Sequence, residues 1–473
     1  MSSEVDVVVL GAGPAGVMAT ARAVELGART ALVTHNEYGG MAANDGPVPV
    51  RTLAHTARLM RDARQLGRYG VTIDDPVLDY SRMLERVREV VTDVRTTSSL
   101  RKQIESQGAI VYQNVGDAHF VDAHNIVTES GLRLHSDRFI ICTGGVSKKL
   151  PIPGFEFTST HSDAWSLTGV PPSMMVIGCG ATGVQVASIF NTFGTRIQLF
   201  EAAPHILPSE DGDVAAAIAD AFQQAGMAVH EDFGTIESFE KTPTGVRMTF
   251  SKDGHRETAE AALAVVAVGW QVDTRALNLA APGVDVTQRG FLKVNEYLQT
   301  CAPHIFAAGD ATGRILLASE GIRDGFVAAT NAVRDVRLPV SSHMIPAGSF
   351  TDPEYASVGL TERKARESHD VVTAVVSFDA NTRAIIDGQT FGFCKLIVDG
   401  KTNEILGCHV VGERAVDIVQ VASVALAAGM LRVDDLARVA VSFPTYAEIL
   451  IQAAIKAALQ MKLDIGWRAH YTA

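Results

Sequence analysis

The sequence has little cysteine, and its cysteines form no arrangement that indicates a redox or metal motif. Five are scattered through 473 residues without C-x-x-C spacing: Cys142, Cys179, Cys301, Cys394 and Cys408. An odd, unpatterned set is what a reducing cytosol permits. We therefore predict a cytoplasmic protein, and we predict no metal site.

Long apolar runs and excess positive charge are missing as well. No uninterrupted apolar run approaches the roughly 20 residues of a membrane span. A strand predicted to begin at Val5 leaves no room for a signal peptide. The net charge of -12 argues against nucleic acid and anionic membrane as partners. The length allows roughly three domains with ample core. With nucleic acid and membrane excluded as partners, we expect a folded enzyme that acts on small molecules.

The N-terminal stretch has the pattern of a strand, a glycine-rich turn and a helix. Residues 5–10 form a short β-branched run, typical of a buried parallel strand, and residues 17–26 have helical spacing. In such a unit the first glycine allows the turn, the second admits a pyrophosphate, and the third lets helix and strand pack. The N–H groups at the helix start hold phosphate charge. The unit predicts a dinucleotide site at Gly11, Gly13, Pro14, Ala15 and Gly16.

The same pattern returns at residues 174–183, which predicts a second dinucleotide. Its turn contains Gly178, Gly180, Ala181, Thr182 and Gly183. The next predicted strand, residues 196–201, ends at Glu201. A carboxylate there accepts hydrogen bonds from both ribose hydroxyls and repels a 2′-phosphate. Residues 202–204 supply no arginine to bind such a phosphate, so we predict NADH over NADPH.

Several later segments make the chain resemble a known family. Residues 39–52 read GGMAANDGPVPVRT, residues 305–310 read IFAAGD, and residues 350–359 read FTDPEYASVG. Together with the doubled glycine turns, these segments resemble the pyridine nucleotide–disulfide oxidoreductase family over essentially the whole chain. The resemblance implies FAD, NAD(H) and a homodimer whose active site is shared across the interface.

The implied fold class is α/β, with two Rossmann-like dinucleotide-binding domains and a C-terminal α+β dimerisation domain. The expected parts are 1–150 (first part of the FAD domain), 151–275 (NAD domain), 276–344 (second part of the FAD domain) and 345–473 (interface domain). Between the glycine turns, residues 55–110 are expected to form two long helices. A further helix is expected over residues 447–461.

The resemblance also implies cofactor contacts outside the two glycine turns. The aspartate of the GD segment, Asp310, is expected to bond the ribityl chain, and Ala318 to approach the flavin ring. Thr34 stands where an acidic residue often bonds the ribose, and it would bond the ribose more weakly. The remaining implied contacts are Gly39, Gly40, Met41, Ala42, Arg51, Ala118, Thr143, Gly144, Gly269 and Gly309.

The chain departs from the family pattern on one side of the flavin. Ala42 and Pro47 occupy the positions of the two redox cysteines, and Phe443 replaces the acid–base histidine of the C-terminal loop. Glu448, which would orient that histidine, is present. The family's lysine–glutamate pair becomes Arg51 and Gln185. The resulting unbalanced cation would favour the anionic reduced flavin.

These departures predict an altered second half-reaction. Thiol–disulfide catalysis needs a thiolate and a base, and both are lost here. We therefore predict that electrons pass from NADH through FAD directly to a small acceptor such as a quinone, in a pocket shaped by Ala42, Pro47 and the partner's Phe443. Asp45, His55 and Tyr446 are possible proton donors; a solvated or packing role is the alternative for each.

Three alternatives stay open at this point. Soluble transhydrogenases of the family also have an aromatic residue in place of the histidine, and they resemble this chain at residues 317–319 and 444–448. An NADH oxidase that forms hydrogen peroxide is a variant of this alternative, in which oxygen reoxidises the reduced flavin. A non-catalytic flavin-binding dimer is an alternative of another class, and NADH would not reduce its flavin.

Overall fold

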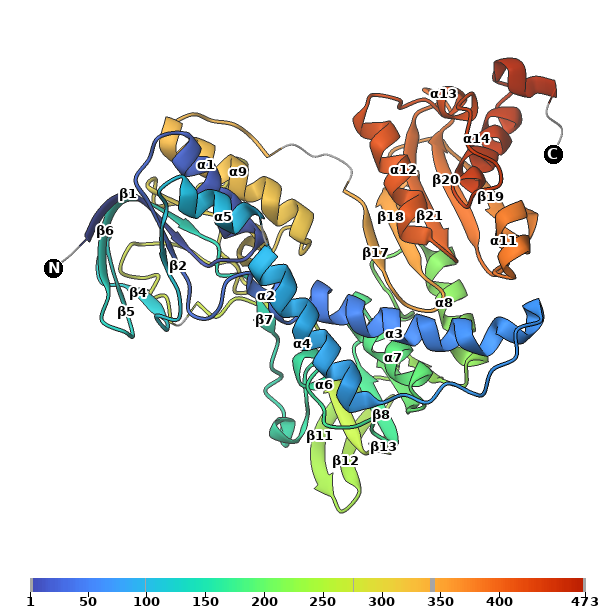
Figure 1. Ribbon diagram of the computed structural model, residues 1–473, viewed down its shortest axis with the longest axis horizontal. Helices are drawn as coiled ribbons and strands as arrows, with labels where there is room; N and C mark the ends of the chain where they lie inside the picture. Colours follow the sequence, from blue (N-terminus) through green and yellow to red (C-terminus); the bar gives the residue numbers. More distant parts are fainter. Residues whose placement is uncertain (1–2, 98, 275, 341–344, 471–473) are drawn as a thin grey trace.

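The computed structural model describes residues 3–97, 99–274, 276–340 and 345–470. Figure 1 shows lobes built on separate sheets, and the predicted α/β class is confirmed. In the part of the chain described, no helix is both long and apolar enough to cross a bilayer. The predicted domain limits at 150, 275 and 344 stay predictions, and residues 275 and 344 lie outside the described ranges.

The first lobe contains a seven-stranded sheet formed by two distant parts of the chain. The strand order is β3-β2-β1-β6-β5-β4, and β16 also pairs with β6. The strands are β1 Ser3–Leu10, β2 Thr30–Val33, β3 Ile110–Tyr112, β4 Ala118–Phe120, β5 Asn125–Thr128, β6 Arg133–Ile141 and β16 Ile305–Ala307. Helices α1 (Pro14–Glu25) and α9 (Ala318–Arg334) pack along each other in this lobe (Figure 1). The late segment therefore completes the lobe that the N-terminus begins.

The second lobe repeats the parallel arrangement on a smaller scale. Its sheet has the order β10-β9-β8-β14, with all neighbours parallel. The strands are β8 Ser173–Ile177, β9 Arg196–Glu201, β10 Ala228–Glu231 and β14 Leu263–Val266, with helices α7 Ala181–Thr192 and α8 Gly212–Gln224. An antiparallel sheet of β11 (Thr235–Thr242), β12 (Gly245–Lys252) and β13 (His255–Ala261) adjoins it. A short pair, β7 (Val146–Ser147) with β15 (Trp270–Gln271), marks the two crossings between the lobes.

The third lobe is an antiparallel sheet with helices, as an α+β domain requires. Its order is β17-β18-β21-β20-β19. The strands are β17 Ala347–Ser349, β18 Tyr355–Gly359, β19 Val371–Ser377, β20 Phe393–Asp399 and β21 Ile405–Val411. Its helices are α10 Glu362–Arg366, α11 Thr382–Asp387, α12 Ala415–Ala427, α13 Val433–Ala437 and α14 Glu448–Gln460. The last helix matches the expected one, with Ala447 and Met461 as its caps.

The two long helices predicted over residues 55–110 are present as α3 (Pro47–Gln65) and α4 (Tyr80–Thr97), but α3 begins earlier than expected and a short third helix, α5 (Ser99–Ser106), follows α4. The short α2 (Gly40–Asn44) precedes them. Helix α3 starts earlier than expected because Pro47 is in its first turn, where a missing N–H costs nothing and the fixed φ suits a helix. Gly70, with a φ of 77°, ends the 3₁₀ turn that follows α3.

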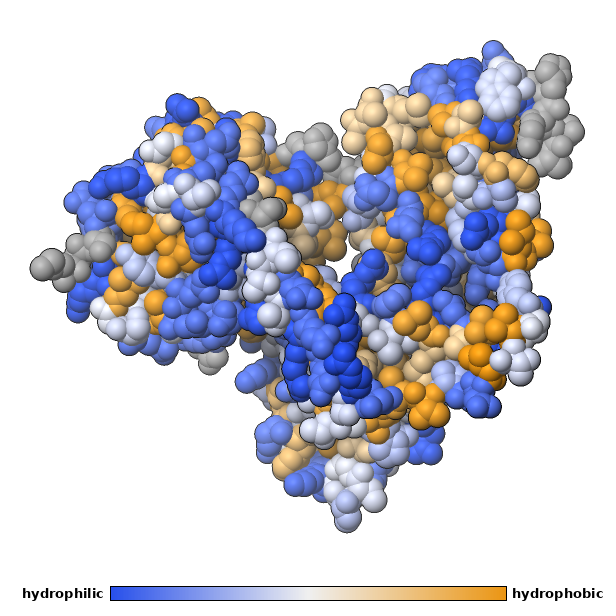
Figure 2. Space-filling view, viewed as in Figure 1, coloured by the Kyte–Doolittle hydropathy of each residue, from blue (hydrophilic) through white to orange (hydrophobic). Residues whose placement is uncertain are grey.

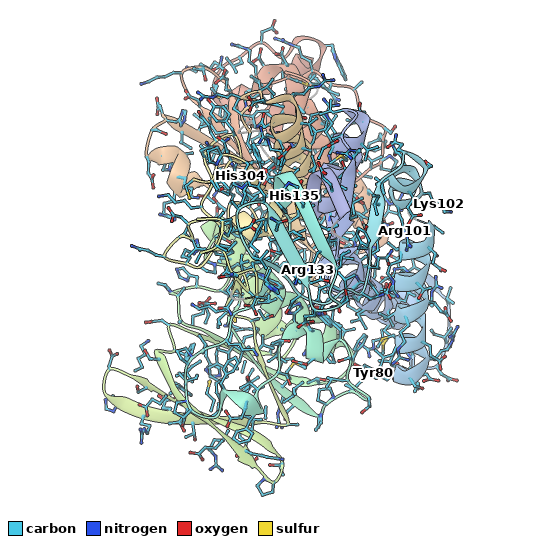
Figure 3. All side chains as sticks on the ribbon, turned by 90° about the vertical axis from the view of Figure 1, so that its left-hand side faces the viewer. Tyr80, Arg101, Lys102, Arg133, His135 and His304 are labelled. Atoms are coloured by element: carbon cyan, nitrogen blue, oxygen red, sulfur yellow. The ribbon has the colours of Figure 1, made fainter. Side chains whose placement is uncertain are left out.

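Helix α4 is amphipathic, which explains its place on the surface. Tyr80, Met83, Leu84 and Val87 are its buried residues. Its outer face is hydrophilic (Figure 2), and Arg82 forms ion pairs there with Glu85 at 3.1 Å and Glu89 at 2.9 Å. Figure 3 shows Tyr80 on α4 and Arg101 and Lys102 on α5, which follows α4 directly in the chain.

Candidate functional site

The first glycine turn fits the pyrophosphate of a dinucleotide. Gly11 has a φ of 105°, and a Cβ there would lie 2.2 Å from the carbonyl oxygen of Cys142. A Cβ on Gly16 would lie 1.7 Å from the carbonyl oxygen of Gly11, so both positions require glycine. At Gly13 the nearest atom to a Cβ is the Gly40 Cα, 3.8 Å away. Gly13 caps α1 without a side-chain hydrogen bond, which leaves the N–H groups of the first turn for an anion.

The second glycine turn repeats this geometry at the start of α7. Cβ atoms on Gly178 and Gly183 would lie 2.6 Å and 2.0 Å from backbone carbonyl oxygens. At Gly180, no non-neighbouring atom of the described chain lies within 4 Å of a Cβ. The Glu201 carboxylate accepts hydrogen bonds from the N–H of Cys179 at 2.7 Å and of Ala203 at 2.9 Å. Glu201 is thus held at this turn, where the sequence placed it.

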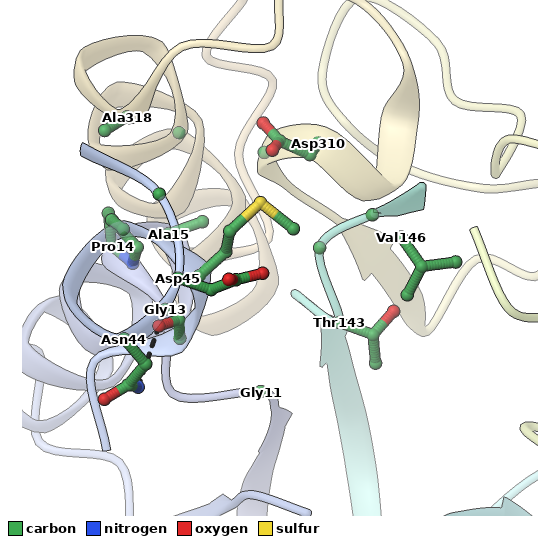
Figure 4. A pocket seen from close by; sticks show the side chains of 18 of the residues that line it. Gly11, Gly13, Pro14, Ala15, Asn44, Asp45, Thr143, Val146, Asp310 and Ala318 are labelled. Carbon is green, nitrogen blue, oxygen red and sulfur yellow. Dashed lines mark hydrogen bonds between the residues drawn. The ribbon is translucent and has the colours of Figure 1, made fainter. Parts of the chain in front are cut away.

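A cavity of about 1020 Å³ joins the first lobe to the start of α7. Figure 4 shows Gly11, Gly13, Pro14 and Ala15 on one side of it, Thr143, Val146 and Asp310 on the other, and Asp45 between them. The predicted residues that line it are Gly11, Gly13, Pro14, Ala15, Thr34, Gly40, Met41, Ala42, Asp45, Pro47, Arg51, Ala118, Thr143, Gly144, Ala181, Thr182, Gln185, Gly309, Asp310 and Ala318. Its size suits an extended nucleotide ligand.

Other predicted residues lie outside the lining of this cavity. Gly16 and Gly39 support its first glycine turn from behind, where Gly16 faces Gly11 and a Cβ on Gly39 would meet Ala43. The remaining ones belong to the second nucleotide unit, to α3 or to the third lobe: Gly178, Gly180, Gly183, Glu201, Gly269, His55, Phe443, Tyr446 and Glu448.

Thr34, which also lines the cavity, follows β2 and is buried. Its N–H donates to the carbonyl oxygen of Tyr112 at 2.9 Å. The neighbouring His35 pairs with Asp117 at 2.7 Å, and Glu129 completes an exposed group of potential metal ligands. Exposed acidic groups are common without an ion, so this cluster is no evidence for a metal centre.

Arg51 and Gln185 lie near each other but make no direct hydrogen bond in the described structure. The Arg51 guanidinium stacks on Phe350, with its carbon 3.1 Å from the ring centroid. Gln185 accepts a hydrogen bond from the Phe350 N–H at 3.5 Å. Glu354 and Asp417 add favourable charge interactions to Arg51, whose pKa is nevertheless lowered by partial burial. The carboxylates of Glu354 and Asp417, both in the third lobe, therefore offset part of the positive charge of Arg51, which Gln185 cannot neutralise.

A histidine that sequence reasoning missed also lines the cavity. His161 is buried on the short helix α6 (His161–Ala164), and its Nε2 lies 3.7 Å from the Asp45 carboxylate. Burial lowers the pKa of His161, while the charges of Asp45 and Asp163 oppose that shift. The segment reads Thr-His-Ser-Asp, a helix-capping pattern with no catalytic spacing, so this residue could not be identified from the sequence.

The predicted C-terminal loop residues make contacts within their own lobe. The Tyr446 hydroxyl donates to Asp387 at 3.0 Å, and burial raises the pKa of Tyr446. Glu448 is buried, which raises its pKa, and its Oε2 has no hydrogen-bond partner among the described residues. Phe443 is 65% exposed. A large apolar side chain so exposed is available for contact with a second subunit.

Helix α3 is fixed to the third lobe by charged contacts. Arg58 pairs with Glu413 and, at 3.9 Å, with Glu354, and Arg61 pairs with Asp352 at 2.8 Å. Burial and the charge of Glu413 raise the pKa of Glu354 to about 7. These contacts set the position of the helix that begins at the cavity wall.

The Glu354→Gln variant should lose a pH dependence of stability. Because the folded-state pKa is about 7 and the ordinary value is 4.5, the native state holds more protons between these pH values. Stability from this group therefore falls as pH rises from 4.5 to 7, by roughly 3 kcal/mol in total. Denaturant unfolding between pH 4.5 and 8 should show a smaller fall in the variant. Asp352→Asn, which changes a more exposed carboxylate, is the matched control; parallel curves for wild type and Glu354→Gln would refute the assignment.

Comparison with known proteins gives consistent matches along the chain. Residues 5–325 match the family described as pyridine nucleotide-disulphide oxidoreductase, and residues 345–454 match its dimerisation domain. A dihydrolipoyl dehydrogenase of Geobacillus stearothermophilus is 31% identical over 458 residues, which cover 95% of this chain and 96% of that protein. A mercuric reductase of Lysinibacillus sphaericus is 29% identical over 453 residues, with coverage of 95% and 82%. The structure of the HOCl-induced flavoprotein disulfide reductase RclA from Escherichia coli matches with a TM-score of 0.84 at 26% identity, covering 95% of this chain and 99% of that one.

Proposed function

This chain belongs to the pyridine nucleotide-disulphide oxidoreductase family, and from that premise we propose that it passes electrons from NADH through FAD directly to a small acceptor such as a quinone. Membership makes it an FAD-dependent oxidoreductase that uses NAD(H) and has the family's dimerisation domain. The proposal of direct transfer from flavin to acceptor depends on the composition of the cavity wall. Ala42 and Pro47, at the positions of the redox cysteines, line the cavity and contain no sulfur.

The cysteines that remain are poor substitutes for a redox pair. Cys142 lines the cavity but is buried, and burial raises its thiol pKa, which disfavours the reactive thiolate. Cys394 and Cys408 are buried in the core of the third lobe, on β20 and β21. Cys179 is buried within the second glycine turn, between Gly178 and Gly180, and Cys301 is exposed and bonds the Gly283 carbonyl oxygen. A disulfide relay beside the flavin needs two thiols, and Cys142 is the one cysteine among the described lining residues of the cavity.

The chain's own residues fit FAD in the cavity. The uncapped first turn of α1 and the open space at Gly13 suit the pyrophosphate, and Asp310 and Ala318 also line the cavity. When bound, FAD supplies the electron transfer from NADH to the acceptor. The protein holds the nucleotide, places the acceptor and shields both from water. The apolar side chains of Ala42, Pro47 and the second subunit's Phe443 suit a flat acceptor.

A preference for NADH over NADPH is part of this proposal. Glu201 stands at the second glycine turn as an ionisable carboxylate held by two backbone N–H groups. A 2′-phosphate beside it would place like charges together, which costs free energy. Ala202 and Ala203, which follow it, offer no positive charge to offset that cost.

Anaerobic stopped-flow kinetics test the proposal. The flavin is first reduced by NADH, with NADPH as the comparison, and is then mixed with a quinone panel, NADP⁺, oxygen, or lipoamide as a disulfide. We expect rapid reduction by NADH and rapid reoxidation by at least one quinone. Faster reoxidation by NADP⁺ would support a transhydrogenase, and faster reoxidation by oxygen would support an oxidase. A flavin that NADH does not reduce would identify a binding protein, and turnover with lipoamide would contradict the proposal.

The Arg51→Ala variant should lower the reduction potential of the bound flavin. A cation at the cavity wall stabilises the added negative charge of the reduced state. Loss of about 1.4 kcal/mol of that stabilisation lowers a two-electron potential by about 30 mV. Equilibration with reference dyes measures the shift. Arg51→Lys keeps the charge and should stay near the wild-type value, and an unchanged potential in Arg51→Ala would remove this role.

A further inference from the structure

Asp45 is the cavity end of a line of side-chain hydrogen bonds that runs to the half-buried Ser147. Ser162 Oγ donates to the Asp45 Oδ2 in a short contact, and the His161 Nε2 lies 3.5 Å from Ser162 Oγ. On the other side of the ring, the His161 Nδ1 lies 3.3 Å from Ser147 Oγ. The four residues come from three separate segments: the end of α2, the helix α6 and the strand β7. Asp45 and His161 line the cavity.

When Asp45 is ionised, one arrangement of hydrogen atoms satisfies this whole line. An ionised Asp45 only accepts, so the Ser162 hydroxyl donates to it and must itself accept from the His161 Nε2–H. The Nδ1 of the neutral ring is then an acceptor for the Ser147 hydroxyl. All donors therefore point in one direction, from Ser147 through His161 and Ser162 to Asp45. Burial of His161 favours the neutral ring that this arrangement requires.

The surroundings hold the imidazole ring in place. Trp270 and Trp165 meet it edge-on, with centroid separations of 5.0 Å and 6.4 Å. Among the described residues, the charged groups that act on it are Asp45 across the cavity wall and Asp163 on its own helix. Asp163 is itself engaged, because its carboxylate accepts from the Thr160 N–H at 2.7 Å. Asp45 is thus the charged group that is connected to the His161 ring through Ser162.

We propose that Asp45 donates a proton to the acceptor and that Ser147, His161 and Ser162 form the relay that returns a proton to it. This inference rests on the proposed function. A quinone that becomes a hydroquinone takes up two electrons and two protons. The hydride from NADH accounts for both electrons and one proton, and the Asp45 carboxyl supplies the other as its O–H bond breaks and a new O–H bond forms on the acceptor. Asp45 is the catalytic residue of this step.

The relay restores Asp45 without leaving net charge inside the protein. The Asp45 carboxylate takes the Ser162 proton, Ser162 takes the Nε2 proton of His161, and the Nδ1 takes the proton of Ser147. These transfers reverse each hydrogen bond of the line, and rotation of the two hydroxyls with a change of the His161 tautomer restores the starting arrangement before the next turnover. Ser147 is only half buried and recovers its proton from water. One proton enters from solvent for each one given to the acceptor. The chain thereby supplies from its own residues the proton that a partner's histidine would otherwise deliver, and His161 and the two serines are positioning residues.

Separate half-reactions of the holoenzyme test the relay. Ser162→Ala and His161→Gln should slow reoxidation by a quinone at least tenfold, and Asp45→Asn about 100-fold, in the range of general acid catalysis. Flavin reduction by NADH should stay within twofold of wild type in all three. Ser166→Ala is the matched control, because Ser166 lies on the same turn but bonds only the Ser162 and Asp163 carbonyl oxygens. Equal reoxidation rates in Ser162→Ala and Ser166→Ala would overturn the relay.

Tryptophan fluorescence gives a readout that does not depend on turnover. Protonation of His161 quenches the adjacent indoles, so the wild-type holoenzyme should show a pH transition with a midpoint below the ordinary value of 6.5. The transition should vanish in His161→Gln and move to lower pH in Asp45→Asn, because a favourable negative charge is removed. An Asp45→Asn midpoint equal to that of wild type would show that the two groups are not coupled and would overturn the relay.

The two measurements separate failure of the relay from failure of the proposed function. If no quinone reoxidises the wild-type flavin, the proposed function fails, and the relay to an acceptor fails with it. If a quinone reoxidises wild type and every variant equally fast, the function stands and the relay alone is refuted. Should His161→Gln not yield a flavoprotein, Ser162→Ala and Ser147→Ala decide the outcome, since each removes a single oxygen.

Discussion

Gly13→Val is expected to yield a folded protein without bound flavin. Gly13 has extended backbone geometry, and the nearest atom to an added Cβ is 3.8 Å away, so the apo-protein has room for the side chain. The branches of valine would occupy the space over the first turn of α1 where the pyrophosphate is proposed to bind. We expect the flavin-to-protein ratio to fall to about one tenth or less of the wild-type ratio. Visible absorbance and release of the flavin by denaturation measure that ratio.

The control for this variant is Gly212→Val. Gly212 also lies at a helix start, and no non-neighbouring described atom is within 4 Å of its Cβ, but it belongs to no glycine-rich turn. This variant should keep its full flavin content. Gly13→Ala, with a smaller side chain, should bind FAD with intermediate affinity. A Gly13→Val protein with a full complement of flavin would contradict the assignment of the first turn.

Gly180→Val should separate the two nucleotide sites. Its position is the counterpart of Gly13, with open space around an added Cβ and no side-chain cap on α7. The variant should keep FAD, but the added branches would block the pyrophosphate of NADH. A loss of about 3 kcal/mol in binding corresponds to a roughly 100-fold slower reduction at low NADH concentration. Stopped-flow bleaching of the flavin measures the rate.

Chemical reduction provides the internal control for Gly180→Val. Dithionite should reduce its flavin as it does in wild type, because it needs no nucleotide site. Reoxidation by a quinone should also be unchanged. If Gly180→Val is reduced by NADH at the wild-type rate, the second glycine turn is not the NADH site.

Much of the architecture could be predicted because the two nucleotide units impose local rules. The strand at Arg196–Glu201 begins and ends where the sequence placed it. The glycines at 16 and 183 are required by backbone contacts under 2.1 Å, which no other residue allows. Patterns of this kind depend on neighbours in sequence, so a sequence contains enough information to find them.

The helices over residues 47–106 show where local pattern was insufficient. In the family pattern Pro47 stands for a lost cysteine and a wall of the acceptor pocket, but proline in a first turn also starts a helix. The start of α3 therefore lay eight residues before the expected stretch at residue 55. Gly70 then ends the helical turn that follows. The break between α3 and α4 follows from this turn chemistry and not from the hydrophobic period.

The parts of the site that depend on distant contacts could not be predicted. Phe350 stacks on Arg51 from a segment about 300 residues away, and this contact replaces the expected pair with Gln185. His161 reaches Asp45 only because β7 and α6 fold back to the cavity. Phe443 lies outside the cavity lining of its own chain, so any role at the flavin requires a second subunit. Tertiary and quaternary structure decide these positions.

The number of electrons that the protein accepts from NADH tests the central claim most directly. An anaerobic titration follows flavin absorbance as NADH is added, and free thiols are counted by alkylation before and after. Without a sulfur relay, bleaching should be complete after one NADH per flavin, and the thiol count should not change. Uptake of a second equivalent with the appearance of two new thiols would show a redox disulfide and contradict direct transfer from flavin to acceptor.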